Sequence, residues 1–146
     1  MKEARIPKIF FDSNVIIDAL SERKNSQYSL ELVKMVFNGK IKGFLATKQI
    51  TDIYYVLKRY EFSEKERTDL LSLVSKYFIL IPTLSSDIKY ALSTYKEGDF
   101  EDYLLDNICK VNCCDYLVTS NELDFKKSRN VVITPKDLVT ILEVNL

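Results

Sequence analysis

Residues 9–14 read Ile-Phe-Phe-Asp-Ser-Asn, three large apolar side chains followed by three short polar ones. Four similar apolar runs follow along the chain, at residues 43–46, 77–81, 116–118 and 131–133. Runs this short and this continuously apolar predict strands that are buried on both faces, as in a parallel sheet.

Amphipathic segments separate these runs and predict helices near residues 15–20, 26–37, 48–60, 85–96 and 100–111. Ser63 with Glu66 forms a capping box that starts one more helix, and Thr134 before Pro135 starts the last. The predicted order is β-α-α-β-α-α-β-α-α-β-β-α. We therefore predict an α/β fold, with three α/β/α layers, a central parallel sheet of about five strands and right-handed crossovers.

The composition limits the class of protein. A length of 146 residues predicts one domain, residues 1–146, and 47% hydrophobic residues exclude a disordered chain. The 21 basic and 21 acidic residues give no net charge, so a nucleic-acid partner would be bound through local charge. No apolar run is as long as a membrane span, and residues 1–5 lack an apolar signal core, so we expect a cytoplasmic protein without membrane contact.

The chain contains no His, which excludes imidazole bases, Ser-His-Asp triads and histidine-based zinc sites. Its three Cys residues, Cys109, Cys113 and Cys114, are odd in number and two of them are adjacent. This spacing favours buried free thiols in a reducing compartment over a disulfide framework or a zinc ribbon. Acid–base or metal chemistry would therefore depend on carboxylates.

Acidic residues occur where such a sheet binds ligands. Asp12 directly follows the first strand, and ligands bind beyond the carboxyl ends of parallel strands. Asp12 or Ser13 could instead cap the next helix. Asp99, Asp102 and Asp106 share one face of a predicted helix, where they could bind a cation or simply stabilise the helix start and face solvent.

Two further segments carry oxygen ligands. Asp52 lies in a segment that is apolar or aromatic nearly all round, which predicts a buried helix in which a carboxylate needs a partner or a cation. Thr119 ends a predicted strand, and Asn121 and Asp124 follow it, although Asn and Asp are also common in turns. Oxygen ligands without His or Cys suit Mg²⁺ or Mn²⁺, which polarise a phosphodiester and lower the pKa of bound water.

These segments resemble the motifs of the PIN-domain family, in particular its VapC-like toxin ribonucleases. The resemblance spans nearly the whole chain and lies in four ordered pieces: residues 10–14, 51–57, 99–102, and 115–121 with 124–125. In the first three pieces, Asp12, Asp52 and Asp102 stand at the positions of the family's catalytic acids.

The resemblance implies an endoribonuclease that uses Mg²⁺ or Mn²⁺ to hydrolyse RNA phosphodiester bonds. It also implies a homodimer and, as partner, a cognate antitoxin protein. The catalytic residues would be Asp12, Asp52 and Asp102, and the metal ligands would be these three with Asn121 and Asp124. We expect Ser13, Asn14, Asp99, Asp106 and Thr119 to lie around them in secondary positions.

The chain departs from the family pattern at two positions. The family more often has Glu where this chain has Asp52, and it often has an acid where this chain has the uncharged Asn121. An alternative is therefore a PIN-like interaction or RNA-binding module with a catalytically weakened site. The basic residues within 126–129 could contact phosphates or form a solvated loop.

Two other α/β classes fit less well. A phosphoacceptor signalling domain would have an acidic acceptor at the end of the third strand, where this chain has Ile81-Pro82-Thr83. A phosphatase with a nucleophilic Asp would have an acid at the position of Asn14.

Overall fold

The computed structural model describes residues 5–23 and 26–145, and its centre is a parallel sheet of five strands. The strands are β1 (Lys8–Phe11), β2 (Lys42–Ala46), β3 (Ile79–Ile81), β4 (Tyr116–Val118) and β5 (Val132–Ile133). The helices are α1 (Ser13–Ser21), α2 (Gln27–Phe37), α3 (Thr47–Lys58), α4 (Glu64–Tyr77), α5 (Ser85–Thr94), α6 (Phe100–Val111) and α7 (Pro135–Asn145), with a short 3-10 helix η1 (Glu122–Phe125). The predicted element order is confirmed.

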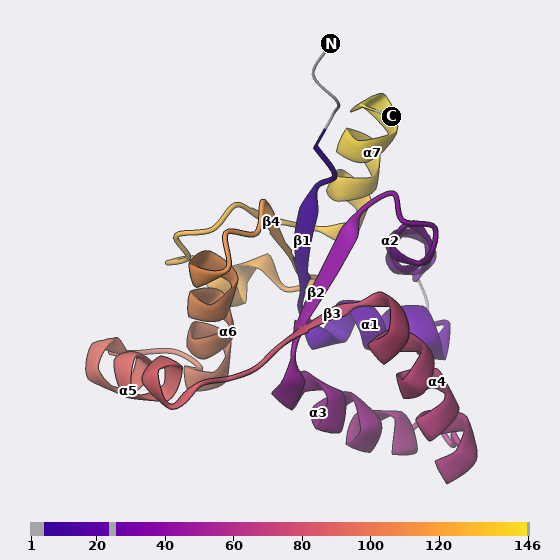
Figure 1. Ribbon diagram of the computed structural model, residues 1–146, viewed down its shortest axis with the longest axis horizontal. Coiled ribbons are helices and arrows are strands. Elements are labelled where there is room, and N and C mark those ends of the chain that lie inside the picture. Colours follow the sequence, from indigo (N-terminus) through magenta and orange to yellow (C-terminus); the bar gives the residue numbers. More distant parts are fainter. Residues whose placement is uncertain (1–4, 24–25, 146) are drawn as a thin grey trace.

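Helices cover both faces of the sheet, as Figure 1 shows. Ile9 and Phe11 of β1 belong to a core cluster with residues of α1, α2, α3, α4 and α7, whereas Phe10 belongs to a second cluster with α5 and α6. All three side chains are fully buried. Successive strand residues face opposite sides, so a sheet with two covered faces needs apolar residues at every position. The predicted α/β/α layering is confirmed.

Two helix starts follow from local sequence. Ser63 Oγ accepts a hydrogen bond from the N–H of Glu66 (3.1 Å), and Glu66 Oε1 accepts one from the N–H of Ser63 (3.1 Å). Thr134 Oγ1 accepts from the N–H of Asp137 (3.2 Å), ahead of α7. Both predicted caps are confirmed, since each satisfies N–H groups that a helix start leaves unpaired.

Three local predictions are wrong. Tyr77, predicted in the third strand, ends α4 and packs its ring against Phe37. The helix around Asp52, predicted to be buried all round, has a solvent face where Tyr55 is 67% exposed, because a tyrosine ring tolerates water at its polar end. Cys113, predicted buried, is exposed in a left-handed turn (φ 56°) after α6.

The strand order is β3-β2-β1-β4-β5. The chain therefore leaves β1 for β2 on one side, and later crosses by α5 and α6 to reach β4 on the other side of β1 (Figure 1). The connections from the carboxyl ends of β1 and β4 diverge at this switch point, which is where open α/β sheets bind ligands. Within the described residues, no helix has the length and apolarity needed to cross a membrane.

Candidate active site

Asp12 lies at the switch point, directly after β1. Its side chain is only 8% exposed, and its Oδ2 accepts a hydrogen bond from Thr119 Oγ1 (2.7 Å) at the end of β4. Asp12 occupies the cap position of α1, but its side chain makes no capping hydrogen bond. The capping alternative therefore does not hold for Asp12.

Thr119 holds this end of the site together. It is fully buried, and the Oγ1 that donates to Asp12 also accepts from the backbone N–H of Asn121 (3.0 Å). Asn121 is thus fixed through its backbone, while the residue itself is exposed. Asp124 follows in η1, and its N–H donates to the carbonyl of Asn121 (3.0 Å).

The start of α6 brings further acids to the same place. Asp99 caps this helix, because its Oδ1 accepts from the N–H of Asp102 (3.0 Å), so the helix-start alternative is correct for Asp99. Asp102 is partly buried and makes no ion pair with any described residue. Burial raises the pKa of Asp102 to about 7, and the negative charges of Asp99, Asp12 and Asp124 add to this rise.

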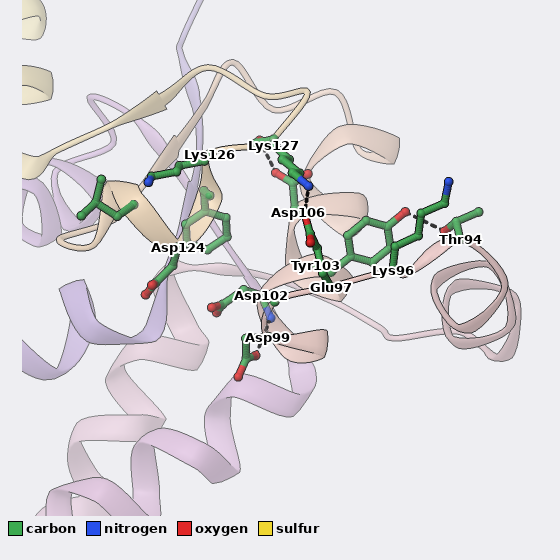
Figure 2. A pocket seen from close by; sticks show the side chains of 14 residues that line it. Thr94, Lys96, Glu97, Asp99, Asp102, Tyr103, Asp106, Asp124, Lys126 and Lys127 are labelled. Atoms are coloured by element: carbon green, nitrogen blue, oxygen red, sulfur yellow. Dashed lines mark hydrogen bonds and ion pairs between the residues drawn. The ribbon is translucent and has the colours of Figure 1, made fainter.

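The same electrostatic effects act on Asp12. Burial raises the pKa of Asp12, and the charges of Asp124 and Glu101 add to the rise, although the hydrogen bond from Thr119 opposes it. Three segments that are distant in the sequence therefore bring carboxylates close enough for their negative charges to act on one another. The carboxylates of Asp99, Asp102 and Asp124 lie together at one end of a pocket, as Figure 2 shows.

Asp106 has a different surrounding from the other acids of α6. It is buried, and its Oδ1 accepts hydrogen bonds from Asn130 Nδ2 (2.7 Å) and from the hydroxyl of Ser128. These bonds tie α6 to the segment before β5. The three acids predicted on one face of this helix therefore differ. Asp99 caps the helix and Asp106 binds the segment before β5, whereas the side chain of Asp102 has no such partner in the described structure.

Asp52 lies on α3 and is half-exposed, with 44% of its side chain accessible, so its predicted burial is wrong. Its Oδ2 is 3.1 Å from Lys48 Nζ, and the same Nζ is 2.9 Å from Glu101 Oε1 on α6. Lys48 was missed by the sequence reasoning. Its spacing of four residues before Asp52, typical of helical ion pairs, was the available signal.

Gln49 is a second residue that the sequence reasoning missed. It is fully buried, and its Oε1 accepts from the N–H of Ala46 (2.8 Å). Its Nε2 donates to the carbonyl of Phe11 (3.0 Å) and to Ser13 Oγ (3.0 Å). Gln49 thereby binds the backbone before Asp12 and the side chain of Ser13 after it, and Asn14 lies next to Ser13 in the first turn of α1. A Gln three residues after a strand end was the available signal.

A cavity of about 440 Å³ adjoins the acids, and Asp102 and Asp124 form part of its wall (Figure 2). Lys126 and Lys127 of the predicted basic cluster also line it. Lys127 is paired with Glu97, and Lys126 is exposed. The cluster is therefore divided between an ion pair and a solvated side chain, and does not form a uniform phosphate-binding patch.

The five predicted metal ligands do not form one ready-made cage. Across residues 5–23 and 26–145, no group of three acidic or thiol side chains is close enough to hold an ion. The chemistry of the donors still fits a hard divalent cation, because Asp12, Asp102 and Asp124 offer carboxylate oxygens that have no ion pair among the described residues. Their side chains would have to draw closer to share one ion. A cation there would relieve the repulsion that raises the pKa of Asp102.

Comparison with known proteins identifies the class to which this fold and site belong. The model of the PIN domain family matches residues 8–123, and the chain belongs to this family. It is 29% identical over 136 residues to Ribonuclease VapC1 of Aquifex aeolicus (strain VF5), an alignment that covers 89% of this chain and 92% of that protein.

Solved structures agree on the fold. A toxin–antitoxin complex from Klebsiella pneumoniae contains a chain similar to this one, with a TM-score of 0.64, 18% identity, and coverage of 87% of this chain and 97% of that chain. VapBC2 from Rickettsia felis, bound to a DNA fragment from its promoter, gives a TM-score of 0.62, 14% identity, and coverage of 86% and 97%. The predicted PIN-like fold is confirmed.

Proposed function

We propose that the protein is a toxin endoribonuclease of the VapC type, which hydrolyses RNA phosphodiester bonds with the help of Mg²⁺ or Mn²⁺. The observation that carries this proposal is the pair Asp12 and Asp102. Both carboxylates lie at the switch point of the sheet, both have raised pKa values, and neither has a cationic partner in the described chain. The similarity to a protein named as a ribonuclease supplies the substrate class.

The ligand set that we propose is narrower than the five residues predicted from the sequence. Asp12, Asp102 and Asp124 would hold the cation, because their charges act on one another without compensation. Asp52 is engaged by Lys48, so its part is indirect. Asn121 supports Thr119 through its backbone N–H.

The residues of the chain would prepare the site as follows. Thr119 orients Asp12 by donating to Oδ2, and Gln49 binds the carbonyl of Phe11, the residue directly before Asp12. A divalent cation supplies Lewis-acid polarisation of the phosphodiester and a bound water of lowered pKa. Asp102 and Asp124, which line the 440 Å³ cavity, would hold the cation at the edge of that cavity.

The proposal extends to partners and location. Toxin–antitoxin complexes are among the similar structures, so a cognate antitoxin is the protein partner we propose. The homodimer that the family resemblance implies is part of the same proposal. The three free thiols suit the reducing cytoplasm.

Cleavage of a single-stranded RNA pool tests the function. The parent should cleave in Mg²⁺ or Mn²⁺ and stop in EDTA, and Asp102→Asn should lose at least about a hundredfold in rate while keeping its circular dichroism spectrum. Asp69→Asn is the matched control, because Asp69 pairs with Lys65 on the exposed surface of α4. Parental cleavage by Asp102→Asn would refute the site. A parent that cleaves no RNA but binds a protein partner would favour the interaction module.

A further inference from the structure

Lys48 bridges two acids that come from different helices. Its Nζ lies 2.9 Å from Glu101 Oε1 on α6 and 3.1 Å from Asp52 Oδ2 on α3. The lysine side chain is 31% exposed, against 44% for Asp52 and 51% for Glu101. Lys48 is therefore the least exposed side chain of the three, and its ammonium links α3 to α6 at the acidic site.

We propose that Lys48 is a built-in counter-ion that takes the place of a second metal, so that the chain binds a single divalent cation on the side of Asp12, Asp102 and Asp124. This inference rests on the proposed metal-dependent function and specifies its stoichiometry.

Positive charge is distributed unevenly between the two sides of the site. Asp52 and Glu101 share one ammonium, whereas Asp12 and Asp102 have no ion pair within the described residues. A divalent cation coordinated by Asp52 or Glu101 would stand within a few ångströms of Lys48 Nζ, and like charges at such a distance repel even near a protein surface. One side of the site is partly neutralised, because one ammonium serves two carboxylates, and the other side has no ion pair among the described residues.

Asn121 points in the same direction, because its side chain brings no charge to this edge of the sheet. With Asp52 already paired, the site has less negative charge to offer a second cation. Lys48 supplies a fixed positive charge in its place.

A second lysine shows what an ordinary surface pair looks like in this chain. Lys65 and Asp69 have the same four-residue spacing on α4, with Nζ 2.7 Å from Oδ2, but they are 84% and 63% exposed and involve no other helix. Exposed pairs of this kind contribute little. Lys65→Met is therefore the matched control for Lys48→Met.

Mn²⁺ stoichiometry, measured by isothermal titration calorimetry and electron paramagnetic resonance on the full chain, tests the proposal. The parent should bind one Mn²⁺. Lys48→Met and Lys48→Gln should bind a second Mn²⁺, or bind the first at least about tenfold more tightly, because a positive charge has left the site. Lys48→Arg keeps the positive charge and should behave as the parent. Lys65→Met removes a charge from the exposed surface of α4 and should also behave as the parent.

The outcomes separate this inference from the function on which it rests. Two Mn²⁺ in the parent, or unchanged stoichiometry and affinity in folded Lys48→Met and Lys48→Gln, would overturn the role of Lys48 and leave the metal site intact. No Mn²⁺ binding by the parent or by either variant would overturn both. Binding only after Lys48 is replaced would also overturn the proposal, because the parent is expected to bind one cation.

Discussion

Each end of the β1–β4 strand pair carries an aspartate, and the two carboxylates have different partners. At the amino end, Asp115 accepts from the N–H of Lys8 (2.8 Å) and from Arg5 Nη2 (2.5 Å). At the carboxyl end, Asp12 accepts from Thr119 Oγ1 (2.7 Å) and has no ion pair in the part of the chain that the structure describes. Both carboxylates join the same two strands, but only Asp115 is neutralised.

The difference separates an acid that serves the fold from one that is available for chemistry. Arg5 balances the charge of Asp115, so the contact with Lys8 joins the strands without leaving an unpaired ion. The hydroxyl of Thr119 orients Asp12 but cannot neutralise it. Burial therefore outweighs this hydrogen bond and raises the pKa of Asp12. An oriented and uncompensated carboxylate is suited to bind a cation.

The sharpest test of this comparison is RNA cleavage by the two Asp→Asn variants. Asp12→Asn should lower the rate in Mg²⁺ by at least about a hundredfold, because the amide keeps the shape but removes the charge that binds the cation. Asp115→Asn should remain within about twofold of the parent, since Asp115 lies at the other end of the strands. Equal losses in two folded variants would mean that the comparison does not separate function from fold.

Thermal stabilisation by Mn²⁺ should also distinguish Asp12 from Asp115. A ligand at 100 times its Kd stabilises the folded state by about 2.7 kcal/mol if it binds that state alone. Saturating Mn²⁺ should therefore raise the melting temperature of the parent and of Asp115→Asn, and far less that of Asp12→Asn. An equal rise in all three proteins would place the cation elsewhere.

Without metal, replacement of Asp115 should lower the free energy of unfolding more than replacement of Asp12. Asp115→Ala removes a partly buried acceptor from the N–H of Lys8, which should lower the free energy of unfolding by about 1–3 kcal/mol in urea titrations with EDTA. Asp12→Asn should not lower it, because the amide removes a charge that burial disfavours. Destabilisation by Asp12→Asn as large as that by Asp115→Ala would assign Asp12 to the fold.

The sequence predicted the sheet and its layers because their signals are local. Runs such as 9–11 are apolar at every position, and the caps at Ser63 and Thr134 depend on residues only three positions away. The position of Asp12 at a strand end follows from the same local pattern. These features do not require knowledge of which helices meet.

The features that escaped prediction depend on tertiary contacts. Asp102 and Asp106 share a predicted helix face, and only the fold of the following segment shows that Ser128 and Asn130 bind Asp106. The second acid partner of Lys48 comes from α6, about fifty residues away in the sequence. A pattern within one helix cannot report such a contact.

The smallest expected effect is the pH dependence of stability in the metal-free protein. The pKa of Asp102 is raised to about 7 from 3.8 in a free side chain, mainly by burial and then by the neighbouring negative charges. Between these two pH values the folded state binds a proton that the unfolded state has released, so ionisation of Asp102 destabilises the fold progressively as the pH rises from about 4 to about 7. The comparison with Asp102→Asn isolates this carboxylate, because the amide is neutral throughout.

In EDTA, the melting temperature of Asp102→Asn should therefore exceed that of the parent by a margin that grows from pH 4 to pH 7 and then levels off. The margin should shrink in high salt, because the repulsion from Asp99, Asp12 and Asp124 acts partly through solvent. Saturating Mn²⁺ should abolish or invert it, since a bound cation favours the ionised carboxylate that Asn cannot supply. A margin that is constant across this pH range would mean that the ionisation of Asp102 is not disfavoured by folding, and that this acid is not part of an uncompensated group with Asp12.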